Sequence, residues 1–567
     1  MRMMLEPRKI SLLLVVLYLP LSVLTAQFDI GKPFIQNYTF RDYNAASQNW
    51  WAIEDDRGIM YFANGTGVLE FDGENWSLMQ SEWLTETRSI AKDEDGTLYV
   101  GLGKDLGYLS PGEDGKMKFV SLKDKLPPEE QNFNIVWEVD YWNGNIYYRS
   151  TEKLFKWDGE AFTVITAGGN FHVGKVIHGK YIVRVWNVGL CELVDDEIRL
   201  LPGGEFFADK RVYVMLPYDD NTVLLGDRDN GKFYLYDYNE LTRFPTELDA
   251  FVQEAGLYLP GLVLPNGNFA FNMFGGGIYI VDREGKLVMN ISKEDGLNDE
   301  TVTYMYIDSR GILWATTFNG ISSINLNSNF TYVDASLGLP SVVFDMEQHN
   351  GMLYAGSNNG IYYYNDATKK FLSMEGTFGQ TTLSAKHRGR LYYGSGGMGI
   401  IEVTGKTFKF VRESKNYDFR VSQIFMSEVD PDRMYVHMQQ GGISSLYYDE
   451  ARGTFIEESF TDQVDPDFGA FMEDSLGNVW TQGLQEGIIV RIEPHIENNK
   501  LDFSRSKYVI YDSDNGLPST PLGFWAIDGI LDVISGSDIY GFDAESERFE
   551  KKESFYADLF EPNAISF

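Results

Sequence analysis

The chain has 567 residues, of which 43% are hydrophobic and 15% aromatic, and its formal net charge is −35. This length allows two or more folded domains, and the hydrophobic content is ordinary for a folded protein. The acidic balance argues against nucleic acid and anionic membrane surfaces as partners, because both require a positive protein surface. It also disfavours a polyanionic ligand, although a local basic pocket is left open.

The N-terminus is typical of an export signal. Basic residues at positions 2, 8 and 9 precede the apolar run Ile10–Leu24, and the small residue Ala26 follows. The sequence therefore predicts a cleaved signal peptide over residues 1–26 and a periplasmic or extracellular location. An uncleaved anchor is the alternative, although the apolar run is shorter than a usual membrane span. Contact with a membrane is expected only through such an anchor or through a segment beyond Phe567.

The best-formed element is a repeat unit between Gly296 and Asn325. Residues 301–308 (TVTYMYID) alternate and are rich in β-branched and aromatic side chains, which predicts a strand. A tight turn at Asp308–Gly311, a second strand over 312–316, a turn in which Gly320 takes positive φ, and a third strand over 321–325 follow. A fourth strand is expected at 329–333 (NFTYV). Such a four-stranded meander cannot bury both of its faces alone, so copies must stack on one another.

About twelve copies of this unit follow one another at a spacing of roughly forty residues, the range of propeller blades. High aromatic content and 56 glycines fit many short strands with tight turns. The predicted fold is all-β, with tandem β-propellers of four-stranded blades. Copies begin near residues 53, 90, 136, 178, 212, 259, 302, 342, 383, 421, 469 and 524.

Twelve blades exceed one ring, so two rings are predicted. Residues 37–40 (NYTF) echo residues 329–332 (NFTY), which suggests that an N-terminal strand completes the seventh blade and latches the first ring. The first propeller is then expected over 27–333 with seven blades. The second is expected over 334–567, with about five blades and the start of another, either incomplete or truncated. A different blade count that closes the second ring at five or six is the alternative.

Candidate ligand contacts come from the loops opposite the Asp-x-x-Gly turns. Amide side chains beside aromatic rings suit neutral sugars, because amides bind hydroxyl groups and flat rings cover the C–H face of a sugar. The alternative is that these amides serve turns and hydrogen bonds between blades. The candidates are Asn49, Trp50, Trp51, Trp186, Asn187, Asn272, Phe274, Asn298, Asn319, Asn358, Gln439 and Gln482.

Catalytic and metal-binding motifs are missing from the sequence. Six scattered histidines form no metal-ligand pair, and neither a nucleophile elbow nor a phosphate-binding loop occurs. The single cysteine, Cys191, excludes an intrachain disulfide. We expect no catalytic residues, no metal and no cofactor, and a small molecule or oligosaccharide as ligand; a homodimer is left open. The rival hypotheses are a secreted propeller lyase or glycosidase, which needs converging carboxylates, and a non-catalytic interaction scaffold.

The unit resembles the two-component-regulator propeller repeat. The motif combines Gly-Leu-(Pro/Asn)-(Ser/Asp), an Asp-x-x-Gly-x-(Leu/Val)-Trp turn and a later Asn-Gly-Ile. It is carried by residues 296–299, 308–314, 319–321, 338–341, 359–361, 474–480 and 516–519, and residues 31–38 with 58–62 resemble the opening of the triple-tyrosine subgroup. The resemblance implies that the chain is the periplasmic sensor region of a hybrid two-component system or of a triple-tyrosine regulator. It implies a role in signal transduction, with output domains that are expected outside this chain. The expected ligand is a glycan fragment.

Overall fold

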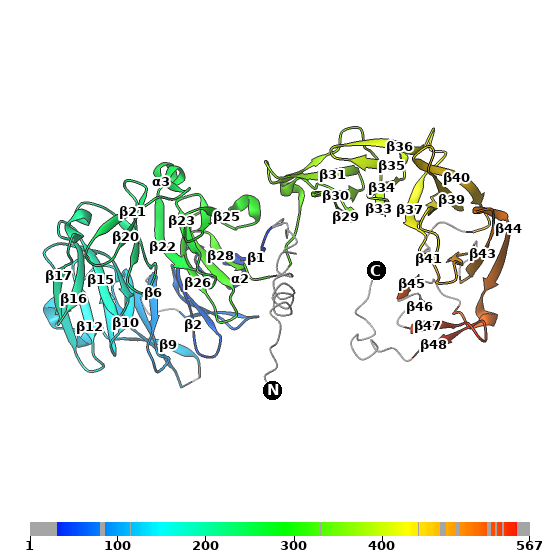
Figure 1. Ribbon diagram of the computed structural model, residues 1–567. Helices are drawn as coiled ribbons and strands as arrows, with labels where there is room; N and C mark the ends of the chain where they lie inside the picture. The colour runs from blue at the N-terminus through cyan, green and yellow to red at the C-terminus, as the bar shows by residue number, and fades with distance from the viewer. Residues whose placement is uncertain are drawn as a thin grey trace, which may run out of the picture. The chain divides into compact units, whose positions relative to one another are not determined.

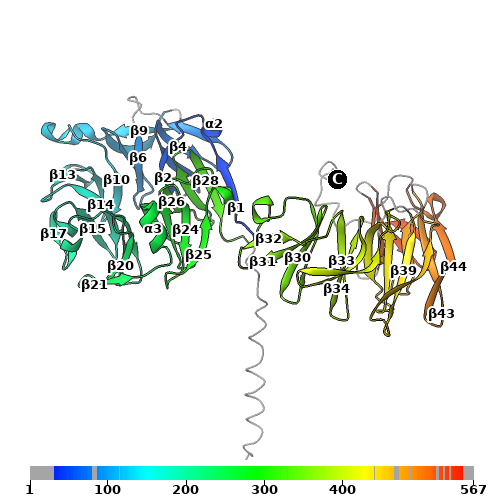
Figure 2. The ribbon, with the colours of Figure 1, turned by 90° about the horizontal axis from the view of Figure 1, so that it is seen from above.

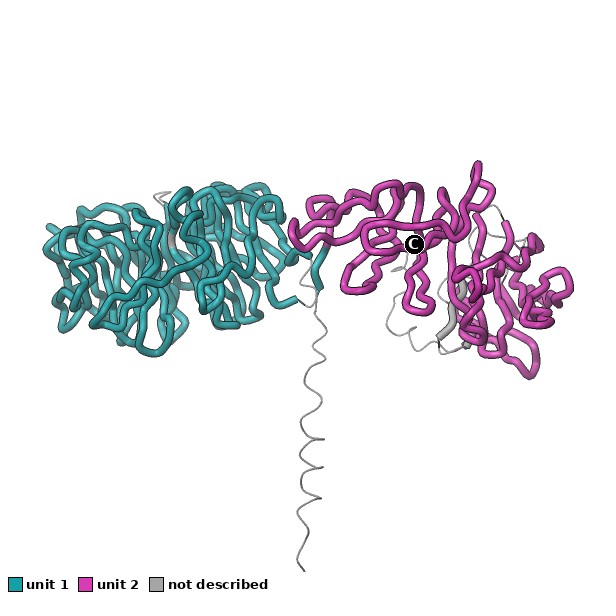
Figure 3. The backbone as a smooth tube through the Cα atoms, turned by 45° about the horizontal axis from the view of Figure 1, so that its top comes forward, with its two compact units in different colours: residues 1–332 teal, residues 333–567 magenta. Residues whose placement is uncertain are grey.

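The computed structural model describes residues 31–79, 86–113, 115–328, 330–439, 441–464, 472–483, 487–518, 523–527, 530–535 and 538–552. The predicted signal peptide lies outside these residues. The chain divides into two compact units, residues 1–332 and residues 333–567 (Figure 3). No helix among the described residues is long and apolar enough to cross a membrane.

The described strands form twelve four-stranded antiparallel sheets, seven in unit 1 and five in unit 2. In all but one sheet the four strands are consecutive in the chain and in the sheet, which is the arrangement of propeller blades. The predicted all-β propeller fold is confirmed (Figure 1). We number the blades of unit 1 from 1 to 7 in the order of their first strands.

The strands of unit 1 are short and regular. Blade 1 contains β2 (Asn49–Glu54), β3 (Met60–Asn64), β4 (Gly67–Phe71) and β5 (Trp76–Met79); blade 2 contains β6 (Thr87–Lys92), β7 (Leu98–Leu102), β8 (Leu106–Pro111) and β9 (Met117–Ser121); blade 3 contains β10 (Glu138–Trp142), β11 (Asn145–Arg149), β12 (Leu154–Trp157) and β13 (Phe162–Ile165). Blade 4 contains β14 (Phe171–Ile177), β15 (Lys180–Val185), β16 (Gly189–Val194) and β17 (Glu197–Leu200); blade 5 contains β18 (Val212–Pro217), β19 (Val223–Asp227), β20 (Lys232–Tyr236) and β21 (Leu241–Phe244). Blade 6 contains β22 (Leu257–Val263), β23 (Phe269–Met273), β24 (Gly277–Val281) and β25 (Leu287–Ile291); blade 7 contains β26 (Val302–Ile307), β27 (Leu313–Thr317), β28 (Gly320–Asn325) and the N-terminal β1 (Phe34–Tyr38).

Unit 2 repeats the same pattern in five sheets. These are β29 (Val343–His349), β30 (Met352–Ser357), β31 (Gly360–Asn365) and β32 (Lys370–Ser373); β33 (Thr381–His387), β34 (Arg390–Ser395), β35 (Gly399–Thr404) and β36 (Thr407–Glu413); β37 (Val421–Met426), β38 (Arg433–Met438), β39 (Ile443–Asp449) and β40 (Thr454–Thr461); β41 (Met472–Glu473), β42 (Val479–Gln482), β43 (Ile489–Glu497) and β44 (Lys500–Tyr511); and β45 (Gly523–Ile527), β46 (Ile530–Ser535), β47 (Asp538–Asp543) and β48 (Arg548–Lys551).

Helical segments are short and lie between strands. They are α2 (Phe40–Tyr43), α3 (Asp249–Ala255) and the 3₁₀ turns η1 (Lys123–Lys125), η2 (Pro128–Glu130), η3 (Gly204–Phe207), η4 (Lys293–Asp295), η5 (Ala335–Leu337) and η6 (Ser513–Asn515).

Unit 1 is a closed ring. Its inner strands contact one another in the cycle β2, β6, β10, β14, β18, β22, β26 and back to β2. The last blade is completed from the other end of the chain, because β1 pairs with β28 in an antiparallel register from Phe34↔Asn325 to Tyr38↔Ile321 (Figure 2). The predicted N-terminal latch is confirmed, although its strand ends at Tyr38 and Thr39 instead caps α2.

The fourth strand predicted at 329–333 is wrong. Within the described part of this segment, Tyr332 makes only an isolated bridge to Lys32. The edge of β28 where this strand would pair is already occupied by β1, so the segment after β28 has no free edge of that sheet to join.

The Asp-Gly turns use their carboxylates to hold the backbone. The side chain of Asp308 accepts hydrogen bonds from the backbone N–H groups of Arg310 (3.0 Å) and Ile312 (2.9 Å) and from the Trp314 indole (3.0 Å). Asp474 repeats this arrangement with the Trp480 indole at 2.8 Å. These turns are structural, because each carboxylate satisfies donors that the turn would otherwise leave unpaired.

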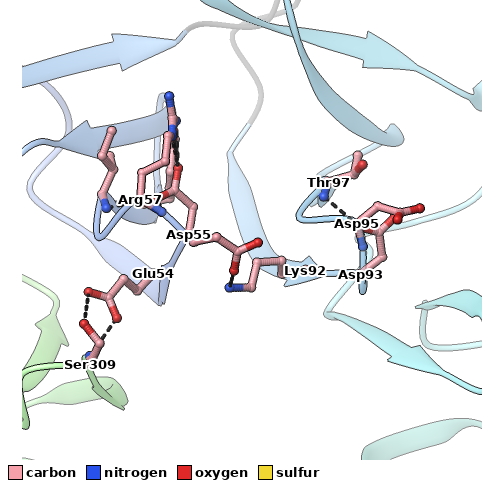
Figure 4. Close-up of polar contacts among 11 residues, drawn as sticks. Glu54, Asp55, Arg57, Lys92, Asp93, Asp95, Thr97 and Ser309 are labelled. Carbon is pink, nitrogen blue, oxygen red and sulfur yellow. Dashed lines mark hydrogen bonds and ion pairs between the residues drawn. The ribbon is translucent and has the colours of Figure 1, made fainter.

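Neighbouring blades are also tied through these turns (Figure 4). The Glu54 carboxylate on blade 1 accepts hydrogen bonds from the backbone N–H (2.6 Å) and hydroxyl (2.9 Å) of Ser309 on blade 7. Lys92 on blade 2 pairs with Asp56 on blade 1 at 2.6 Å. The first of these contacts joins the two blades at which the ring closes.

Replacing Tyr38 with alanine should weaken this closure. The Tyr38 ring lies 5.3 Å from Phe71, 5.2 Å from Trp76 and 5.9 Å from Trp314, so it joins the aromatic cores of blades 1 and 7. Loss of a packed aromatic ring lowers the free energy of unfolding by about 3 kcal/mol, and by somewhat less at a half-buried site. The expected result is a lower urea midpoint for unfolding followed by tryptophan fluorescence. Phe34→Ala on the same strand is the control, because Phe34 is 66% exposed; equal effects of the two substitutions would contradict the latch.

Candidate functional site

A cavity of about 360 Å³ lies within unit 1. Its volume falls in the range of small-molecule pockets, roughly 300–1,000 Å³. The lining comes from five blades, mostly from the inner strands and the loops next to them. The lining residues are Trp51, Trp137, Glu138, Arg149, Thr151, Phe171, His172, Val173, Lys175, Trp186, Tyr213, Met215 and Pro260.

Local irregularities interrupt the pairing of six inner strands of unit 1. The register shifts by one residue near the start of β2, β6, β14, β18 and β26, and by two in β22. A β-bulge leaves one residue unpaired and turns its side chain away from the regular alternation. The residues in these irregularities include Trp50, Arg88, His172, Tyr213 and Thr303.

Ring-bearing and guanidinium side chains form a rim, and four of them lie in these bulges. We define the rim as one residue from each blade of unit 1, in order Trp50, Arg88, Trp137, His172, Tyr213, Tyr258 and Phe318. Three of them also line the cavity. The Arg88 guanidinium carbon lies 3.9 Å from the ring centre of Trp50 and 5.2 Å from that of Trp137. The distances between ring centres are 5.5 Å for His172 and Tyr213, 6.3 Å for Tyr213 and Tyr258, 6.3 Å for Tyr258 and Phe318, and 5.4 Å for Phe318 and Trp50.

Each of the three lining indoles is held by a specific neighbour. Trp51 stacks on Tyr304 with ring centres 3.8 Å apart. The Arg184 guanidinium lies 3.5 Å from the centre of Trp186 and is itself held by the backbone carbonyls of Phe207 and Ala208. The Trp137 indole N–H donates to the Thr151 hydroxyl at 3.0 Å. The indoles are therefore preorganised, which lowers the entropic cost of binding a ligand against them.

The charged groups of the cavity are Glu138, Arg149 and Lys175. Glu138 is nearly buried and accepts a hydrogen bond from Arg149 at 2.8 Å and a second from the backbone N–H of Gly174 at 3.3 Å. Lys175 lies 3.9 Å from the other oxygen of Glu138 and 5.4 Å from the ring centre of Trp51. Burial disfavours the charged form of Lys175, but Tyr304, Glu138 and Asp140 outweigh it and raise the pKa of the ammonium group. Lys175 is therefore a cation at neutral pH.

His172 is a neutral imidazole. Burial lowers its pKa, and the guanidinium groups of Arg184, Arg149 and Arg211 lower it further, to about 3. Its ring stacks on Tyr213 and meets Trp186 edge to face at 5.5 Å. A neutral imidazole can donate one hydrogen bond and accept one, which suits a ligand hydroxyl group.

Two of the twelve predicted residues, Trp51 and Trp186, line the cavity, and Trp50 belongs to the rim. Phe274 is 46% exposed and lies 5.7 Å from the rim residue Tyr258. The predicted aromatic residues thus include two that line the cavity, whereas none of the predicted Asn and Gln residues lines it.

The predicted amides of unit 1 hold the backbone. Asn49 is fully buried and donates to the Gly320 carbonyl at 3.2 Å and the Tyr43 hydroxyl at 3.1 Å. Asn272 is also fully buried and donates to the Pro260 carbonyl at 3.3 Å. Asn298 donates a hydrogen bond to the backbone carbonyl of Asn319, and Asn319 is an exposed residue. Asn187 lies in an exposed turn with a φ of 63°.

The remaining three candidates belong to unit 2. Asn358 is exposed in the turn between β30 and β31, while Gln439 and Gln482 are half-buried at the ends of β38 and β42. The lining of the cavity comes entirely from unit 1, so these residues are not part of it.

The sequence analysis missed most of the charged and polar lining. Trp137, Arg149, His172, Lys175 and Tyr213 were not candidates, although an aromatic or basic residue near the start of successive inner strands was a usable signal. For His172 and Tyr213 the bulges hid this signal, because an inserted residue breaks the regular alternation of a strand.

Replacing Asp140 with asparagine should reduce the stability that the folded state loses as the pH rises from about 4 to about 7. Asp140 accepts a hydrogen bond from Tyr181 at 3.1 Å. Loss of hydration and the nearby Glu138 carboxylate raise the pKa of Asp140 from its ordinary 3.8 to about 7. The folded state thus binds a proton that the unfolded state has lost, so this residue's contribution to stability falls between about pH 4 and pH 7 and is level above that range.

The measurement is the melting temperature of both proteins at about pH 5 and about pH 8. We expect the wild type to lose about 2–4 °C more than Asp140→Asn over this interval. Asp237→Asn, at an exposed turn, is the control. Parallel curves for wild type and Asp140→Asn would contradict the raised pKa.

Comparisons with known proteins agree with the fold. No protein-family model and no curated protein sequence matches the chain. Among solved structures, the chain is similar to the extracellular domain of BT3049 from B. thetaiotaomicron, described as a hybrid two component system, with 15% identity, a TM-score of 0.65, and coverage of 92% of this chain and 72% of that one. The extracellular domain of BT4673 from the same organism, described as a one component system, matches with 14% identity, a TM-score of 0.43, and coverage of 91% and 73%. The predicted resemblance to the extracellular propellers of two-component regulators is confirmed at the level of the fold.

Proposed function

We propose that the protein is the extracytoplasmic ligand-sensing part of a bacterial signal-transduction regulator, and that the cavity of unit 1 binds its ligand, a glycan fragment. The fold supports the sensor role, because a solved structure with similar architecture over most of the chain is the extracellular part of a described two component system. The N-terminal residues predict export, as such a role requires. Membership of the triple-tyrosine subgroup and a homodimer stay predictions.

The observation that carries the ligand site is the convergence of three indoles from three blades on one cavity. Trp51, Trp137 and Trp186 all line it, and each is held on one side by a protein group. Flat aromatic surface with a few polar groups is what a sugar ring needs, because its C–H face packs on the ring and its hydroxyls bind the polar groups.

A binding role is better supported than glycoside hydrolysis. Hydrolysis by the usual mechanism requires two carboxylates across the scissile bond. The described lining of the cavity contains one carboxylate, Glu138, and both of its oxygens face cations. We therefore expect the protein to bind and release its ligand without cleaving it.

Trp186→Ala should weaken ligand binding about tenfold, since stacking on one aromatic ring contributes on the order of 1 kcal/mol. A panel of oligosaccharides released from plant and host polysaccharides would be screened against the purified chain by thermal shift and tryptophan fluorescence. Phe410→Ala, an exposed aromatic residue of unit 2, is the control and should bind as the wild type does.

Two results would overturn the proposal. One is that no oligosaccharide of the panel changes the melting temperature or the fluorescence. The other is that Trp186→Ala binds a positive compound as tightly as the wild type. Chromatography of the incubated oligosaccharides tests the rival directly, because released product would establish an enzyme.

A further inference from the structure

The cavity is positively charged within an acidic protein. The chain carries a net charge of −35, but the lining holds two cations, Arg149 and Lys175, against one carboxylate, Glu138. Behind the lining, Arg184 lies 3.5 Å from Trp186, and Arg88 lies 5.2 Å from Trp137 and pairs with Glu86 at 2.8 Å. The carboxyl group of Asp140 interacts with Lys175. The local sign of the charge is thus opposite to that of the whole chain.

These cations are not equally available to a ligand. Arg149 is 4% exposed and gives its short hydrogen bond to Glu138, and Arg184 is fully buried against backbone carbonyls. The Lys175 side chain is 31% exposed and lines the cavity. Its one ion pair among the described residues is the long contact of 3.9 Å to Glu138, and no hydrogen bond from its ammonium group occurs there.

An ammonium group has three N–H donors and attracts an anion most strongly where water is largely excluded. Here the donors of Lys175 are directed at no close acceptor, while the adjacent Glu138 is already neutralised by Arg149 at 2.8 Å. Glu138 and Asp140 stabilise the charge of Lys175 from a distance, but a neutral ligand would leave its N–H donors without a close hydrogen-bond acceptor, which is unfavourable. An anionic group at the same place would satisfy it.

We propose that Lys175 binds a carboxylate on the ligand, so that the cavity takes an acidic sugar, the uronic acid residue of a glycan fragment, with its ring against the lining indoles. This inference rests on the proposed function and narrows its ligand. The neutral ring of His172, which also lines the cavity, is placed to hydrogen-bond a hydroxyl group of the same sugar. The amide groups expected to bind a neutral sugar do not line the cavity, which agrees with an acidic one.

The test compares matched acidic and neutral probes on the full chain. A trimer of galacturonic acid and a trimer of galactose differ only in their carboxylates, and benzoate offers a carboxylate on an aromatic ring. Calorimetric titration of the wild type should give at least tenfold tighter binding for the acidic trimer. Raising the salt from about 0.05 to about 0.5 M should reduce that advantage, because salt screens a partly exposed charge.

Three variants identify the residue. Lys175→Met should lose the preference for the acidic trimer, and Lys175→Arg, which keeps the charge, should retain most of it. Lys180→Met is the matched control, because Lys180 lies in the next strand, β15, and pairs with Glu192 at 2.8 Å. The melting temperature of each variant without ligand shows whether it is folded. Should Lys175→Met be unfolded, the salt dependence of the wild type and the Lys175→Arg result decide.

Equal affinity for the two trimers, or a preference that Lys175→Met keeps, would overturn the inference and leave the proposed glycan sensor standing. Binding of benzoate through Lys175 with no binding of the acidic trimer would overturn it as well, because the ligand would then be an aromatic acid. Failure of every oligosaccharide, with or without a carboxylate, would overturn the proposed function itself.

Discussion

Closure of unit 1 depends on the pairing of β1 with β28. A four-stranded blade exposes two apolar faces, and stacking neighbours buries them only if the first and last blades also meet. The N-terminal strand completes the last blade, so the two ends of the ring are joined by backbone hydrogen bonds. Around this joint Tyr38 fills the space between the cores of blades 1 and 7, and Glu54 binds Ser309 across them. The energetic consequence is that opening the ring requires breaking a strand pair and not only a packed surface.

The cavity lies within the ring that this joint closes, and five of its blades line it. Its rim runs through all seven blades of unit 1, and the contact between Trp50 and Phe318 crosses the joint between the first blade and the last. Bulges in the inner strands turn a large side chain toward the channel from several blades, where a regular strand would bury it between blades. A ring of short, similar strands thereby provides a cavity whose lining comes from five blades.

Charge is separated in this unit. Acidic residues of the turns, such as Asp55, Asp93 and Asp308, are occupied by backbone N–H groups and hold the strands in place. The basic side chains Arg149, Arg184 and Lys175 gather in and behind the cavity. A partly exposed cation in a cavity still attracts an anion locally, although salt screens part of that attraction. Net charge alone therefore does not describe the charge of the cavity.

The sequence by itself determined the architecture: the repeat, the turn at Asp308–Gly311 and the N-terminal strand that completes a blade all follow from alternation, turn chemistry and self-similarity, which are local or repeated signals. Local pattern also favoured aromatic candidates, and Trp51 and Trp186 do line the cavity. Only the tertiary structure decided that β1 displaces residues 329–333 from the edge of β28, and that Lys175, Arg149 and His172 meet. Arg149 comes from blade 3, Lys175 and His172 from blade 4, and His172 lies in a bulge. Pairing between distant segments and the register within a strand are set by packing that no local pattern encodes.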